Sequence, residues 1–158
     1  MNVQRFCIDA AATQRAGEEW AHLLVAGDLV LLIGPLGAGK TTFAQGVGRG
    51  LGVKERITSP TFTVVRQHEC RNARGIETLH HADVYRVGAL SEVDDLALGE
   101  LVEESAVALV EWGDIASSLF GRNVITVTFE VDREEGRTLS VEGAIDDRAE
   151  EITEWARS

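Results

Sequence analysis

The chain has 158 residues, of which 44% are hydrophobic and 26% charged, with a formal net charge of −11. This composition predicts one globular domain that buries a sizeable core, and it excludes a disordered chain. No apolar run approaches the ~20 residues of a membrane span and no targeting segment is visible, so we expect a cytoplasmic protein that does not enter a membrane.

The first half of the chain predicts strands alternating with helices. A short strand over residues 4–8 precedes a helix that Asp9 or Thr13 caps and that runs to about Val25. The apolar residues 29–33 predict a buried strand, and a helix follows over residues 40–51. Residues 57–65 begin as a loop around Pro60 and become a strand, which we expect to pair antiparallel with a strand over residues 76–83.

The second half adds further strands to the same sheet. A helix is predicted to start at Ser91, and the apolar residues 106–110 are typical of a strand buried on both faces of a parallel sheet. A helical turn over residues 115–120 precedes two alternating segments, 124–131 and 137–142, which predict a hairpin. Residues 146–157 predict a polar terminal helix, at the edge of the domain, with Ile152 and Trp155 on one face. We therefore expect one α/β domain over residues 1–158, with a mixed parallel and antiparallel sheet flanked by helices.

The charge and the cysteines restrict the functional classes. Net negative charge argues against non-specific binding to nucleic acid. Residues 41–90 nevertheless contain seven Lys or Arg and four acidic residues, a net +3 that could contact phosphates of a nucleotide or of a larger anionic partner. Cys7 and Cys70 lack the paired spacing of metal ligands, so we expect buried thiols in a reducing compartment.

The segment between the strand at 29–33 and the following helix, Gly-Pro-Leu-Gly-Ala-Gly-Lys-Thr at residues 34–41, matches the phosphate-binding loop pattern. Glycines let the backbone N–H groups surround phosphate oxygens, and the start of the helix adds further donors. Lys40 would neutralise phosphate charge and the Thr41 hydroxyl would bind Mg²⁺. We therefore predict a nucleoside triphosphate at the carboxyl end of this strand. The expected contacts are Gly34, Gly37, Ala38, Gly39, Lys40, Thr41 and Thr42.

Hydrolysis or transfer also needs an acid near the metal. Glu111, at the end of a buried strand, is the first candidate, and Asp83 is the second. His80 and His81 are expected to be ordinary hydrogen-bonding histidines, because Mg²⁺ prefers oxygen ligands. Residues 58–61 carry several hydroxyls and suit a loop that orders around a γ-phosphate, although an ordinary proline turn is equally consistent with them. Trp112 could belong to the core or lie over the nucleotide.

Four ordered segments together resemble the TsaE (YjeE) family: residues 34–43, 59–65, 81–86 and 109–112. The resemblance implies a P-loop ATPase that uses ATP and Mg²⁺, is weak alone and is activated by its partners. It implies that these partners are TsaD and TsaB, in the threonylcarbamoyladenosine modification of tRNA, and that tRNA is reached through their complex.

The same resemblance implies roles for individual residues. Lys40, Asp83 and Glu111 would be catalytic, and Thr41, Glu111 and Asp83 would hold the metal. Thr61 would act in the switch segment. Thr13, Trp112 and Arg137 would lie near the nucleotide.

The sequence departs from the family pattern at two motif positions: Gly113 replaces the usual proline after Glu-Trp, and Pro35 replaces an acidic residue. Two other functions remain open: a small-molecule kinase, and an assembly factor gated by nucleotide without significant turnover. A GTPase is disfavoured because no Asn-Lys-x-Asp segment is present to recognise guanine.

Overall fold

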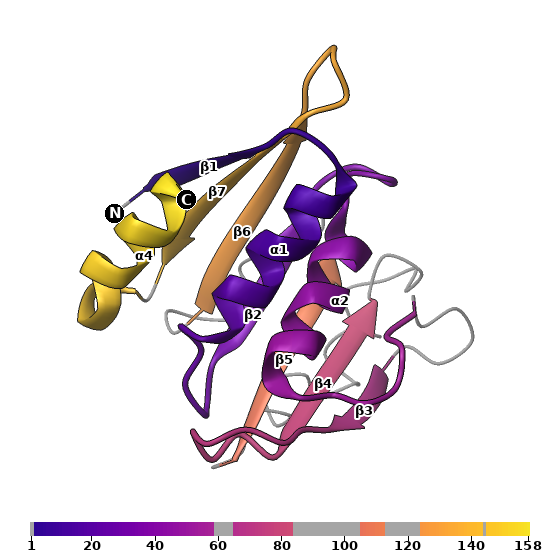
Figure 1. Ribbon diagram of the computed structural model, residues 1–158, viewed down its shortest axis with the longest axis vertical. Helices are drawn as coiled ribbons and strands as arrows, with labels where there is room; N and C mark the ends of the chain where they lie inside the picture. The colour runs from indigo at the N-terminus through magenta and orange to yellow at the C-terminus, as the bar shows by residue number, and fades with distance from the viewer. Residues whose placement is uncertain (1, 59–64, 84–104, 113–123, 144) are drawn as a thin grey trace, which may run out of the picture.

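The computed structural model describes residues 2–58, 65–83, 105–112, 124–143 and 145–158, and these form an α/β fold around a seven-stranded sheet (Figure 1). The strands are β1 (Val3–Cys7), β2 (Leu29–Ile33), β3 (Val65–Glu69), β4 (Thr78–Asp83), β5 (Ala106–Trp112), β6 (Val124–Val131) and β7 (Arg137–Gly143). The helices are α1 (Ala10–Ala21), α2 (Lys40–Leu51), a 3-10 helix η3 (Asp146–Arg148) and α4 (Ala149–Arg157). The predicted single α/β domain with a mixed sheet is confirmed.

The sheet has the order β1-β7-β6-β2-β5-β4-β3. Its centre is parallel, since β2 pairs with both β5 and β6, and β4 pairs with β5. Its two margins are antiparallel, since β3 pairs with β4, and β7 pairs with both β6 and β1. The predicted hairpin of β6 with β7 and the parallel strand over residues 106–110 are therefore confirmed. The antiparallel pairing with the strand over residues 76–83 is also present, but the strand β3 that makes it is Val65–Glu69, which shares only Val65 with the predicted segment 57–65. Buried on both faces, the central strands β2 and β5 carry the continuous apolar runs expected of parallel strands.

Helices α1 and α2 lie side by side across one face of the sheet, and α4 lies beside β1 (Figure 1). Their apolar faces meet in one core, in which Trp20 of α1 and Trp155 of α4 make an edge-to-face contact with ring centroids 5.0 Å apart. Phe43 of α2 makes a similar contact with Phe129 of β6 at 5.6 Å. The helix that carries Lys40 and Thr41 is thus fixed against the centre of the sheet.

The boundaries of two predicted helices are corrected. Asp9 is the N-cap of α1, because its side chain accepts the Ala12 N–H at 2.8 Å, and Thr13 lies inside the helix. The helix ends at Ala21 and not near Val25, because the following N–H groups bond to carbonyls three residues back in a tighter turn. The terminal helix begins with η3 before α4. The helices predicted from residue 91 and over 115–120 lie outside the described residues.

The two cysteines are buried free thiols, as predicted. Burial raises the pKa of the Cys7 thiol, and it raises the pKa of Cys70 to about 11. Neither sulfur is therefore a thiolate near neutral pH. In the part of the chain that the structure describes, no helix has the length and apolar character needed to cross a membrane.

Candidate functional site

The loop between β2 and α2 lies at the carboxyl end of the central strand. Gly37 and Gly39 have φ values of 81° and 100°, which side chains rarely tolerate. Gly34 is needed for packing, because a Cβ there would lie 2.9 Å from the Cβ of Phe129. Gly39 is the N-cap of α2 and makes no side-chain hydrogen bond to the first turn of the helix. The first-turn N–H groups of α2 are therefore donors of the kind that bind phosphate.

Lys40 lies over this loop. Its side chain is largely buried, with 7% of the residue exposed, and its Nζ donates to the carbonyl oxygens of Gly34 at 2.5 Å and Pro35 at 3.3 Å. The loop itself closes with a hydrogen bond from the Ala38 N–H to the Pro35 carbonyl at 3.1 Å. The ammonium is thus placed inside the curve that the phosphate-loop pattern assigns to phosphate oxygens.

Arg137 supports the loop from the start of β7. Its Nε donates to the Ala38 carbonyl at 2.9 Å and its Nη2 to the Gly37 carbonyl at 3.3 Å. Thr13 of α1 lies beside the loop, since a Cβ on Gly39 would lie 3.3 Å from the Thr13 Cγ2. Arg137, which hydrogen-bonds to the loop, and Thr13, which lies beside it, both line the pocket that adjoins the loop.

A pocket of about 370 Å³ adjoins the loop, between the start of α1 and the β6–β7 hairpin. Thr13, Gly37, Gly39, Thr42 and Arg137 contribute to its walls. Ile8, Asp9, Ala10, Glu134 and Glu135 complete the lining. Five of the thirteen residues predicted from the sequence for the site thus converge on one cavity.

The acidic side of the site lies at the carboxyl ends of β4 and β5. Glu111 is 4% exposed. Its Oε1 accepts a hydrogen bond from the Thr41 hydroxyl, with an oxygen–oxygen distance of 2.7 Å. Its Oε2 lies 2.5 Å from the Nε2 of His81. Asp83, 8% exposed, is the register partner of Glu111 on β4. The structure therefore brings the first residue pair predicted for the metal, Thr41 and Glu111, into direct contact.

The donor set fits Mg²⁺ bound together with phosphate. Among the described residues, no group of three or more His, Cys, Asp or Glu side chains is arranged to hold a metal ion alone. Mg²⁺ instead takes one or two carboxylates, phosphate oxygens and water. The Thr41 hydroxyl and the Glu111 carboxylate are oxygen donors beside the phosphate loop, and Asp83 ends the adjacent strand. These residues fit such a site.

Some predicted residues cannot be placed in the site. Thr61 lies outside the described residues, and so does the side chain of Trp112, whose backbone pairs with Ile33 at the end of β5.

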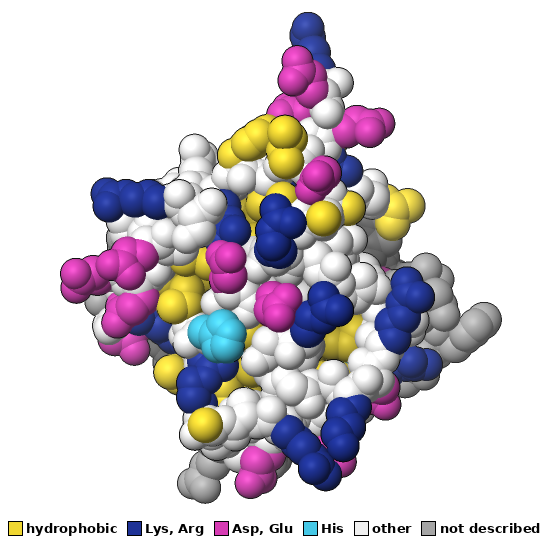
Figure 2. Space-filling view, viewed as in Figure 1, with side chains coloured by type: hydrophobic (Ala, Val, Ile, Leu, Met, Phe, Trp, Pro, Cys, Tyr) yellow, Lys and Arg dark blue, Asp and Glu magenta, His cyan; other side chains and the backbone are white. Residues whose placement is uncertain are grey.

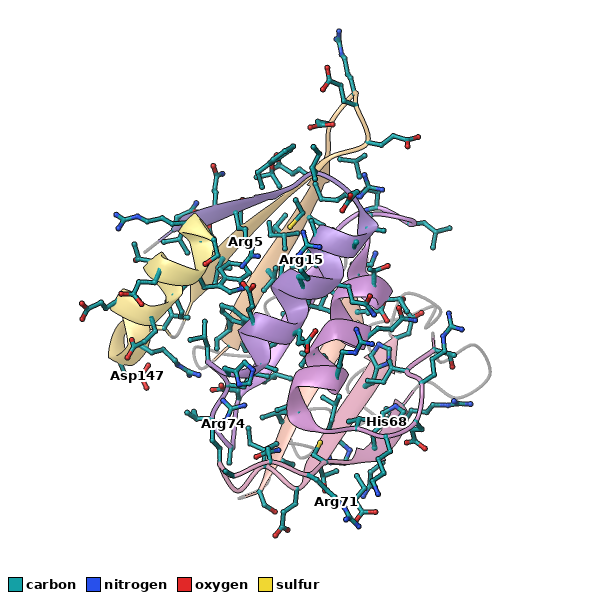
Figure 3. The ribbon with its side chains drawn as sticks, viewed as in Figure 1. Arg5, Arg15, His68, Arg71, Arg74 and Asp147 are labelled. Atoms are coloured by element: carbon teal, nitrogen blue, oxygen red, sulfur yellow. The ribbon has the colours of Figure 1, made fainter. Side chains whose placement is uncertain are left out.

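Four of the described basic side chains of residues 41–90 lie away from the pocket beside the phosphate loop. Arg49, Lys54 and Arg56 line a separate pocket of about 460 Å³. Lys and Arg side chains are frequent at the lower right of the face shown in Figure 2. Arg74 lies at the end of α1, where it donates to the carbonyls of Leu24 and Ala21 (Figure 3). The residues that line the pocket beside the phosphate loop therefore do not include Arg49, Lys54, Arg56 or Arg74.

The contact between His81 and Glu111 is the feature that sequence reasoning missed. The prediction of an ordinary hydrogen-bonding histidine is confirmed, but its partner was not foreseen. A signal was present, because residues two apart in a strand share a face and His81 stands two residues before Asp83. The partner itself depends on the pairing of β4 with β5, which the local sequence does not specify.

Comparison with known proteins identifies relatives along most of the chain. The family described as "Threonylcarbamoyl adenosine biosynthesis protein TsaE" matches residues 7–139. The chain is 36% identical to the tRNA threonylcarbamoyladenosine biosynthesis protein TsaE of Treponema pallidum over 137 residues, which are 85% of this chain and 98% of that protein. It is 48% identical to the protein of the same name from Streptomyces coelicolor over 99 residues, 62% of this chain and 65% of that one.

The fold has a solved counterpart. A crystal structure of Bacillus subtilis YdiB superposes with a TM-score of 0.75, covering 99% of this chain and 95% of that one at 24% sequence identity. At this level of identity the likeness concerns the fold, and it agrees with the α/β architecture described above.

Proposed function

Because the chain belongs to the TsaE family, whose members act in tRNA threonylcarbamoyladenosine biosynthesis, we propose that it is an ATPase that uses Mg²⁺ and assists a TsaB–TsaD complex in that modification. The observation that carries this proposal is the 2.7 Å hydrogen bond between Thr41 of the phosphate loop and Glu111 at the end of β5. It joins two residues that lie 70 positions apart in the sequence and that this proposal assigns to the phosphate and metal sides of the site.

Each side chain of the site has a role in this proposal. The N–H groups at the start of α2 bind phosphate oxygens, and the Lys40 ammonium moves from the Gly34 carbonyl to the β- and γ-phosphates. Thr41 and Glu111 would hold the metal, directly or through water, and Asp83 would help to organise the metal or the attacking water. When bound, Mg²⁺ neutralises charge that develops on the phosphates.

The remaining parts of the proposal concern the surroundings of the site. The pocket beside Thr13 and Arg137 is large enough to take part of the nucleoside. TsaB and TsaD would complete the site, and tRNA would be reached through them. The two free buried thiols are consistent with the cytoplasm as the compartment in which this occurs.

ATP binding is tested by comparing the only two lysines of the chain. Lys40→Ala removes a charged donor from the loop, whereas Lys54→Ala makes the same change of charge on the exposed wall of the other pocket. We expect Lys40→Ala to weaken ATP binding about 10- to 100-fold, the value of a hydrogen bond to a charged group, and Lys54→Ala to leave it unchanged. Titration calorimetry with ATP and Mg²⁺ measures both; equal affinities for Lys40→Ala and wild type would contradict the proposal.

Turnover separates the proposed ATPase from the two alternative functions. We expect phosphate release to be slow with the chain alone and faster with purified TsaB and TsaD, and we expect Glu111→Gln to stop it. ATP binding without phosphate release in the presence of both partners would instead indicate a nucleotide-gated assembly factor. A phosphorylated nucleoside or metabolite would indicate a kinase.

A further inference from the structure

The Glu111 carboxylate is held from two sides. Its Oε1 accepts from Thr41 of α2 at 2.7 Å, and its Oε2 lies 2.5 Å from the Nε2 of His81 on β4. His81 is completely buried and Glu111 is 4% exposed. A carboxylate this deeply buried depends on hydrogen bonds for its ionised form, and these two contacts occupy one oxygen each.

The proton of the His81 contact can be assigned from its neighbours. An ionised carboxylate only accepts hydrogen bonds, so the Nε2 of His81 is the donor. The opposite nitrogen, Nδ1, is buried and has no hydrogen-bond partner among the described residues. A neutral ring with its proton on Nε2 uses its single N–H in this contact, whereas an imidazolium would bury a second N–H without a partner. We assign the neutral Nε2–H tautomer.

We propose that His81 is a positioning residue, which fixes the Glu111 carboxylate so that Oε1 faces Thr41 and the metal side of the site. This rests on the proposed Mg²⁺–ATP function and extends it by a residue that does not touch nucleotide or metal. Residues 81 and 83 of β4 share one face of the strand, and Asp83 is in register with Glu111. His81, which is completely buried, therefore approaches Glu111 from a position two residues before Asp83 on the same face of β4.

The size of the effect follows from other metal sites. Removing the hydrogen-bond partner of a metal-binding side chain typically weakens metal affinity 10- to 100-fold. Without His81, the Glu111 carboxylate would keep, among the described residues, the Thr41 contact alone, and it could rotate about its last torsion, which is broad for a terminal carboxylate. The metal would then meet a Glu111 carboxylate without a fixed orientation, so its affinity would fall. The contacts between the phosphate loop and the nucleotide would remain.

The test uses Mn²⁺ as the probe, titrated by electron paramagnetic resonance into the full chain with saturating ADP. His81→Leu removes the donor, and we expect it to weaken Mn²⁺ binding about 10- to 100-fold. His81→Gln keeps an N–H at a similar reach and is expected to restore most of the affinity. His81→Asn is too short to reach Oε2 and should behave like His81→Leu; it replaces that variant if the leucine does not fold.

Two controls separate positioning from a general structural effect. ADP affinity in EDTA reports the loop alone, and we expect it to be the same in wild type and in all His81 variants. His68→Leu removes a second His–Glu contact of 2.5 Å, between His68 of β3 and Glu55, away from the loop. It should leave Mn²⁺ affinity unchanged.

The outcomes distinguish this inference from the proposed function. Unchanged Mn²⁺ affinity in His81→Leu and His81→Asn would overturn the positioning role, and so would a loss of ADP affinity in EDTA as large as the loss of Mn²⁺ affinity. A wild-type chain that binds no ADP or ATP would overturn the proposed function itself.

Discussion

At the scale of single residues, the phosphate loop is held by side chains that lie outside it. Arg137 donates to the carbonyls of Ala38 and Gly37, and Thr13 occupies the space that a Cβ on Gly39 would approach to 3.3 Å. Carbonyls held in this way keep the opposite side of each peptide, the N–H, directed into the loop. We infer that Arg137 acts on phosphate binding through the loop backbone.

Arg137→Ala should therefore weaken ATP binding while the protein stays folded. Two charge-assisted hydrogen bonds are lost, and the value of one such bond, about 1.5–3 kcal/mol, predicts a loss of about 10- to 100-fold in affinity. Arg133→Ala is the matched control, because Arg133 is exposed on the same hairpin and carries the same charge. Calorimetry measures both variants. Equal losses would mean that only the charge of the hairpin matters.

At the scale of elements, the close packing of α1 on α2 places Thr13 beside the loop. Three glycines allow it: a Cβ on Gly17 would lie 2.2 Å from the Phe43 carbonyl oxygen, and one on Gly46 would lie 2.0 Å from the Gln14 carbonyl oxygen. A Cβ on Gly50 would lie 2.5 Å from the Glu18 carbonyl oxygen. A glycine inside a helix makes the helix about 1 kcal/mol less stable than an alanine would. These glycines therefore weaken each helix by itself but allow the two helices to pack closely.

Gly46→Ala should force the two helices apart. Because the obstacle is backbone, which cannot move aside, we expect a loss of about 1–3 kcal/mol in the free energy of unfolding, as for other overpacked cores. Gly48→Ala is the control in the same helix: its Cβ would meet the end of the Ile57 side chain, which can change rotamer. Urea unfolding followed by circular dichroism compares the two. A smaller loss for Gly46→Ala than for Gly48→Ala would refute this account.

At the scale of the whole molecule, the C-terminal segment is joined to the rest of the fold by polar contacts as well as by its apolar face. Arg148 forms a bidentate ion pair with Asp28, in which Nη1 lies 2.6 Å from Oδ2 and Nη2 lies 2.8 Å from Oδ1. Its Nη1 also donates to the Leu23 carbonyl. The hydrogen bonds to Asp28 raise the pKa of the Arg148 guanidinium. The indole N–H of Trp155 donates to the Ala16 carbonyl, and Arg5 reaches between β1 and α4 (Figure 3).

Arg148→Ala should lower the free energy of unfolding by about 3 kcal/mol, because it leaves the Asp28 carboxylate buried without its partner. Asp28 stands just before β2, and the phosphate loop stands just after β2. The Asp28–Arg148 ion pair therefore lies at the opposite end of this strand from the site. ATP affinity of the folded protein should therefore be unchanged. Arg157→Ala, an exposed arginine of α4, is the control. Thermal unfolding and calorimetry together test this; a matching loss of ATP affinity would contradict the separation.

Much of the fold could be predicted because its signals are local. Residues 29–33 and 106–110 are apolar without interruption, and both form central parallel strands. The alternation over 124–131 and 137–142 predicted the β6–β7 hairpin correctly. The predicted end of α1 near Val25 was wrong by four residues, since the helix ends at Ala21. The Val25 N–H donates to the Asp28 side chain and not to a helix carbonyl, and no helix propensity near Val25 indicates that contact.

The sequence by itself determined the phosphate loop, since left-handed backbone at Gly37 and Gly39 and a lysine beside them are properties of eight adjacent residues. Arg137 and Glu111 were expected near the nucleotide, but only the tertiary structure decided their contacts: Arg137 with the Ala38 carbonyl 99 positions away, and Glu111 with Thr41 and His81. The reason is physical. Backbone geometry and hydrophobic period are fixed by neighbouring residues, whereas side-chain contacts depend on strand order and on the approach of two helices, which all parts of the chain set together.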